Sequence, residues 1–104
     1  MEPSIFPTEA DITPHLLKIV TDKSIQLKAR AEAASILSNR KTEEVVNTLV
    51  SLLTEEESVL TREAMVSLGE IGNPRASPHL EAVSFESGNL EATRLEVIKV
   101  LQRK

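Results

Sequence analysis

The chain has 104 residues and contains no cysteine, no tryptophan and no tyrosine; its aromatic side chains are Phe6 and Phe85. The absence of cysteine excludes disulfides, thiolate nucleophiles and zinc sites built on cysteine. The scarcity of aromatic rings removes the stacking platforms that single-stranded nucleic acids require. It also removes the Trp and Tyr anchors of many protein interfaces, so a partner would be held by aliphatic and charged side chains.

Long apolar runs and an excess of basic charge are missing as well. No apolar stretch approaches the ~18 residues that a membrane span needs, and the first residues lack the basic start and apolar block of a secretory signal. The formal net charge is -4, whereas nucleic-acid binders cluster Lys and Arg against phosphate. We therefore expect one domain over residues 1–104, in a cytoplasmic protein that binds neither nucleic acid nor a membrane.

The tripeptide Pro-His-Leu occurs at residues 14–16 and again at residues 78–80, 64 positions later. Shifting the sequence by half that distance, 32 positions, aligns Arg30 with Arg62 and also Arg62 with Arg94. Apolar residues follow each arginine at three and four places, and apolar residues or glycine follow at six and seven. Such self-similarity is typical of repeat architectures. It predicts three units, at about residues 10–40, 41–72 and 73–104.

Each unit has the pattern of two helices. The first helices are expected to start near residues 10–14, 42–46 and 74–78, and the second near 24, 55 and 90. Residues 42–54 of the middle unit show an i, i+3, i+4, i+7 apolar stripe. In the following helix, six apolar residues are expected to face inward, namely Val59, Leu60, Ala64, Met65, Leu68 and Ile71. Strand signals are absent, so six helices are predicted, with breaks near residues 22, 40, 54, 72 and 88.

Turn residues support these boundaries. Gly72 can adopt the left-handed conformation that ends a helix, and Pro74 fits the first turn of the helix that follows. Thr54 and Glu57 have the spacing of a capping box. Side chains that can cap a helix start occur at three further boundaries, namely Thr42, Asn73 and Asn89.

At residues 60–83 the sequence reads LTREAMVSLGEIGNPRASPHLEAV. This stretch resembles the short HEAT-like repeats first noted in phycobilin lyases: the Arg-x-Ala start, the Leu-Gly-Glu-Ile-Gly-Asn-Pro turn and the following Pro-x-Leu all match. The resemblance implies an all-α fold, a right-handed α-α superhelix of about three two-helix repeats with one convex and one concave layer. Because a two-helix unit cannot bury its own apolar face, the units must stack.

The repeated histidines and arginines each allow a functional and a structural interpretation. His15 and His79 lie two units apart, which corresponds to ~20 Å at helix packing distances, whereas zinc–nitrogen bonds are ~2 Å. We therefore expect surface histidines, no metal site and no cofactor. The arginine column could be a basic ladder for an acidic partner. The resemblance favours a structural role, in which each arginine satisfies carbonyls or carboxylates between units.

Polar residues on the first helix of each unit form the candidate binding surface. If this layer is concave, they align into one mixed-charge groove for a protein partner. The candidate residues are Asp11, His15, Lys18, Glu43, Asn47, Arg75 and His79.

No catalytic motif occurs, so the expected function is a non-enzymatic adaptor or scaffold that binds another protein. One alternative is a bilin lyase-type subunit that handles a tetrapyrrole. A second alternative is a HEAT-like solenoid that binds nucleic acid, although its charge opposes this. The last helix carries Leu95, Val97, Ile98, Val100 and Leu101, which cover more than one helical face. We therefore expect weak self-association through this helix, or continuation of the solenoid in a longer parent protein.

Overall fold

The computed structural model of the chain describes residues 9–55, 57–86 and 88–103, with side chains from residue 12 onward. These residues form six α-helices and contain no strand, and none of the helices is long and apolar enough to cross a membrane. The elements are α1 (Glu9–Thr21), α2 (Leu27–Leu37), α3 (Glu43–Ser51), the 3-10 helix η1 (Leu52–Thr54), α4 (Ser58–Ile71), the 3-10 helix η2 (Pro74–Ala76), α5 (Ser77–Ala82) and α6 (Gly88–Gln102). The all-α prediction and the positions of its breaks are confirmed.

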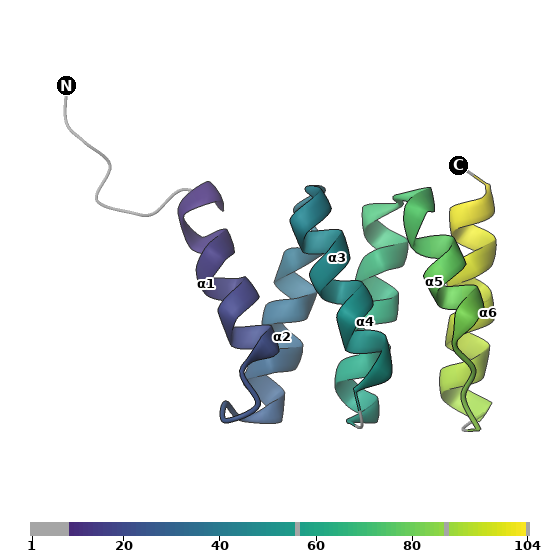
Figure 1. Cartoon of the computed structure of the whole chain (residues 1–104), viewed down its shortest axis with the longest axis horizontal. Helices are drawn as coiled ribbons and strands as arrows, with labels where there is room; N and C mark the ends of the chain where they lie inside the picture. Colours follow the sequence, from purple (N-terminus) through teal and green to yellow (C-terminus); the bar gives the residue numbers. More distant parts are fainter. Residues whose placement is uncertain (1–8, 56, 87, 104) are drawn as a thin grey trace.

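The helices pack as three consecutive pairs, α1 with α2, α3 with α4 and α5 with α6. The pairs stack in a row, so that α1 lies at one end and α6 at the other (Figure 1). α4 packs directly against both α2 and α6, whereas contacts among α1, α3 and α5 are sparse. The molecule is therefore an open stack of helix pairs, as predicted for an α-α superhelix, in which the second helices form the closely packed layer.

One apolar cluster runs through all three pairs. It extends from Leu16 on α1 to Leu101 on α6 and includes leucines of the middle helices that are fully buried. Burying one such side chain stabilises the folded state by about 1.5–3 kcal/mol. No pair has a core of its own, since the residues of α4 pack against α2, α3 and α6 together.

Three predicted helix boundaries are confirmed in atomic detail. Gly72 has a φ of 76° and a ψ of 20°, and its N–H donates to the carbonyl oxygen of Leu68 at 3.0 Å. The Thr42 hydroxyl accepts from the Val45 N–H at 3.3 Å, and Asn73 accepts from the Arg75 N–H at 3.0 Å. These local interactions end and restart the chain where the sequence indicates.

Two predicted caps are wrong. Asn89 lies inside the first turn of α6, which begins at Gly88. Thr54 ends the 3-10 turn η1, and its hydroxyl donates to the Ser51 carbonyl at 3.4 Å. α4 begins three residues after the predicted start, with Glu57 at its N-cap and no hydrogen bond from a capping side chain. The burial of Leu52 and Leu53 explains the second difference, because it holds the chain in helical turns as far as Thr54.

Candidate functional site

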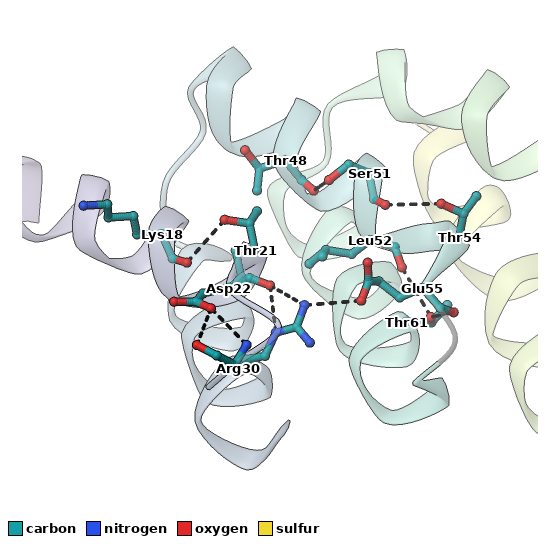
Figure 2. A network of polar contacts seen from close by, with 12 residues as sticks. Lys18, Thr21, Asp22, Arg30, Thr48, Ser51, Leu52, Thr54, Glu55 and Thr61 are labelled. Carbon is teal, nitrogen blue, oxygen red and sulfur yellow. Dashed lines mark hydrogen bonds and ion pairs between the residues drawn. The ribbon is translucent and has the colours of Figure 1, made fainter. Parts of the chain in front are cut away.

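Arg30 is almost completely buried at the base of the first two units, with an exposed fraction of 4%. Its Nε and Nη2 atoms donate to the carbonyl oxygen of Val20, at 3.1 and 2.9 Å, and Nη2 also reaches Glu55 Oε1 at 3.2 Å. Figure 2 shows the guanidinium between the end of α1 and the segment that precedes α4. The side chain caps the C-terminal end of α1 and links the first unit to the second, which confirms the structural role predicted for it.

Arg94 repeats this arrangement in the third unit. Its Nη1 donates to the Leu80 carbonyl at 3.0 Å, and its Nε donates to Glu91 Oε1 at 3.0 Å. The hydrogen bond from Arg94, together with one from the Phe85 N–H, lowers the pKa of the Glu91 carboxyl below its usual value. The same carboxylate raises the pKa of Arg94. Both terminal units thus use an arginine to satisfy a carbonyl of the preceding helix.

The middle arginine does not belong to this series, and the predicted column is wrong there. Arg62 is exposed and makes no ion pair or side-chain hydrogen bond with a described residue. Its neighbour Thr61 is buried, and its hydroxyl shares a hydrogen between the carbonyl oxygens of Leu52, at 3.3 Å, and Glu55, at 3.2 Å. In the middle unit a threonine therefore has the position that arginine has in the other two.

The candidate residues on the first helices divide into two groups. The side chain of Asp11 lies outside the described part of the structure. His15 and Lys18 are exposed and line a hollow beside Asp22, near the end of α1.

The remaining four candidates meet in a separate and smaller hollow of about 70 Å³. Glu43 and Asn47 on α3 face Arg75 and His79 of the third unit, and Arg75 forms an ion pair with Glu43. Both partners are exposed, so the pair contributes about 0–1 kcal/mol. Neither hollow shares a lining residue with the other. Partner binding by these residues stays a prediction.

In the described part of the chain, the exposed large apolar side chains lie on the other layer, of which the sequence prediction used only the last helix, for self-association. Among the described residues, the four large hydrophobic side chains that remain exposed are Ile36 on α2, Val59 and Val66 on α4, and Leu95 on α6. Val59, predicted to face inward, is 53% exposed. The available signal was the seven-residue spacing of Val59 and Val66, which places both on one side of a helix, two turns apart.

A furrow of about 340 Å³ runs between α4 and α6. Its apolar lining is formed by Val66, Val97 and Val100 together with Gly69. A Cβ atom at Gly69 would lie only 3.4 Å from Val97 Cγ1, so the absence of a side chain lets Val97 pack against the backbone of α4. A second furrow, with Leu27, Ala31 and Val59 in its lining, separates α2 from α4.

A hollow of about 480 Å³ adjoins the Arg30 network. Its described lining contains Lys23 and Arg30 together with Glu55 and Glu57. Within the described part of the chain, no three His, Asp or Glu side chains are grouped so that they could hold a metal ion.

Comparison with known families gives a match over nearly the whole chain. The sequence profile of HEAT repeats matches residues 13–102. This description is broader than the phycobilin lyase type that residues 60–83 resemble. A comparison with curated proteins gave no match.

Proposed function

The chain belongs to the HEAT repeat family, and we propose that it is a non-enzymatic adaptor that binds another protein through its layer of second helices. HEAT repeats generally mediate protein–protein interactions, and stacked repeats present extended surfaces for that purpose. The proposal assigns the binding surface to α2, α4 and α6.

The observation that carries this assignment is the distribution of exposed apolar side chains. Among the described residues, the four large hydrophobic side chains that are exposed all lie on α2, α4 and α6. Two furrows with apolar linings also lie between these helices. An apolar centre bordered by polar side chains is the usual composition of a protein interface, and exposed apolar patches commonly mark interaction sites.

The non-enzymatic part of the proposal is supported by the use of the buried polar side chains. Arg30, Thr61 and Ser67 are the buried polar residues of the described chain, and each donates to a main-chain carbonyl. The Ser67 hydroxyl, for example, donates to the Ala34 carbonyl at 2.8 Å, which joins α4 to α2. These groups hold the stack together, since a buried polar group without a partner costs about 1–3 kcal/mol.

Affinity capture from the native host with two matched double variants tests the proposal. Val59→Glu with Val66→Glu places two charges on the second-helix layer, and His15→Glu with His79→Glu places two charges on the first-helix layer. All four positions are exposed, so both variants should fold, which circular dichroism and thermal melting check.

The adaptor proposal expects proteins captured by the wild type to be lost from the first variant and retained by the second. The opposite result would show that the first-helix residues form the interaction surface. Retention by both variants would refute binding through either layer.

A further inference from the structure

The furrow between α4 and α6 has a defined charge as well as an apolar floor. Two carboxylates, Glu70 and Glu96, lie in its lining on opposite helices, and no basic side chain of the described residues lines it. Both are exposed, and neither forms an ion pair with a described residue. The furrow between α2 and α4 differs, because Lys28 lies in its lining beside Glu32 and Glu63. The α4–α6 furrow therefore presents an apolar surface between unpaired negative charges.

We propose that the α4–α6 furrow binds a lysine- or arginine-rich amphipathic helix of a partner protein. The inference rests on the proposed function and specifies the partner's chemistry. The apolar face of such a helix would cover Val66 and Val100, while basic residues beside that face would reach Glu70 and Glu96. The net charge of -4 also attracts a basic partner over distances of about 10 Å at moderate salt.

The backbone of the partner favours a helix over an extended segment. The described part of this chain is helical and offers no strand edge, so an extended peptide would lose water from its N–H and C=O groups without gaining partners. A helix satisfies these groups internally. From Thr93 to Val100 the lining covers two turns of α6, or about 10 Å, so two to three turns of a partner helix are sufficient to fill the furrow.

The inference is tested with synthetic peptides and fluorescence anisotropy. The probe is a labelled 14-residue peptide of leucine and lysine with leucines at helical spacing. Its matched controls are the same peptide with glutamate in place of lysine and a scrambled leucine–lysine peptide. We expect the lysine helix to bind at least tenfold more tightly than either control, with amide shift changes in heteronuclear NMR confined to α4 and α6.

Two double variants separate local charge from total charge. Glu70→Lys with Glu96→Lys reverses the furrow, and Glu44→Lys with Glu86→Lys makes the same change in net charge at exposed positions outside it. We expect the furrow variant to lose at least tenfold in affinity for the lysine peptide and the control variant to stay within about twofold. Equal losses in both variants, or equal affinity for all three peptides, would overturn the inference.

Sedimentation of the wild type distinguishes the alternative occupant. Self-association that disappears in the furrow variant, with no peptide binding, would show that a second copy occupies the site and would refute the inference. Failure of the inference and failure of the proposed function remain distinguishable. A protein captured by the wild type, lost with Val59→Glu and Val66→Glu but retained with Glu70→Lys and Glu96→Lys, would leave the adaptor standing and refute only its basic partner.

Discussion

Replacing Arg30 with methionine should destabilise the protein far more than replacing any exposed arginine. The substitution keeps an unbranched, mostly apolar side chain but removes the donors that satisfy the Val20 carbonyl and Glu55. Hydrogen bonds from a charged group contribute about 1.5–3 kcal/mol, and loss of one partner from a buried ion pair costs about 3–5 kcal/mol. Glu55 retains 17% of its side-chain exposure, so water partly compensates it. We expect a cost of about 3 kcal/mol.

Arg62→Met is the matched control, because it removes the same group from the next unit. Arg62 is exposed and has no described polar partner, so its replacement should change stability by less than about 0.5 kcal/mol. Urea unfolding followed by circular dichroism at 222 nm measures both variants. A cost below about 1 kcal/mol for Arg30→Met, or equal costs for both, would refute the assignment of Arg30 as the tie between units.

A double-mutant cycle with Glu55→Gln separates the two functions of the guanidinium. Glu55→Gln alone leaves the Val20 carbonyl satisfied, so we expect a cost of about 1 kcal/mol. Combined with Arg30→Met, the two changes should be non-additive by about 1–2 kcal/mol, as is common for residues in contact. Strict additivity would mean that Arg30 stabilises the fold only through the end of α1.

Four further predictions concern other parts of the chain. Gly72→Val should cost about 1–2 kcal/mol or more, because its φ of 76° disfavours a β-branched residue; an unchanged melting temperature would contradict this. The pKa of Glu91 is lowered, so its stabilisation is present above about pH 4.5 and is lost as the pH falls through the lowered pKa. Glu91→Gln should therefore make the melting temperature less dependent on pH over this acidic range. An unchanged dependence on pH would argue against this prediction. His15→Ala and His79→Ala should each stay within about 1 kcal/mol, with no effect of added zinc on thermal melts. Weak self-association at high micromolar concentration should be reduced by Leu95→Glu in sedimentation equilibrium, and a strictly monomeric wild type would refute it.

The boundaries of the helices could be predicted because they depend on local chemistry. Gly72 ends α4 through its own backbone conformation, and Thr42 and Asn73 cap with side chains that reach only two or three residues along the chain. The failed capping box at Thr54 depends instead on Leu52 and Leu53, which are held by the core. Local signals decide a boundary only where tertiary packing does not impose another.

The exposed face of α4 could not be read from periodicity alone. The apolar pattern shows that residues 59–71 form a helix with a wide apolar stripe, but the width of the buried part depends on what packs on either side. α4 contacts α2, α3 and α6, which bury Leu60, Ala64 and Leu68 and leave Val59 and Val66 in contact with solvent. The sequence prediction places the candidate site on the first helices, because that layer is expected to be concave, and it treats most of the apolar residues of α4 as core.

Terminal-helix exposure shows the same limit. The apolar residues of α6 cover more than one face in sequence, yet Val97, Ile98 and Leu101 are buried against the preceding units and Leu95 is left half exposed. The apolar surface available for self-association is therefore smaller than the sequence indicates. Continuation of the stack in a longer parent protein stays a prediction.

The repeat has unequal units, and this explains the misplaced arginine. The buried leucines of the first helices are Leu16, Leu49 and Leu80, and their counterparts on the second helices are Leu37, Leu68 and Leu101. Within the units, these leucine pairs are 21, 19 and 21 positions apart, so the middle unit is two residues shorter between its helices. From one unit to the next, Leu37 and Leu49 are 12 positions apart, and so are Leu68 and Leu80.

A constant shift of 32 consequently matches the outer units, which are 64 residues apart, and misplaces the helices of the middle unit by one residue. One residue corresponds to a rotation of about 100° around a helix. That rotation takes Arg62 out of the position of Arg30 and Arg94 into solvent and brings Thr61 into it. The shorter threonine still reaches two carbonyls, of Leu52 at 3.3 Å and of Glu55 at 3.2 Å, because both lie in the short segment between α3 and α4. The side chain at this position is thus matched to the length of the connection that it closes.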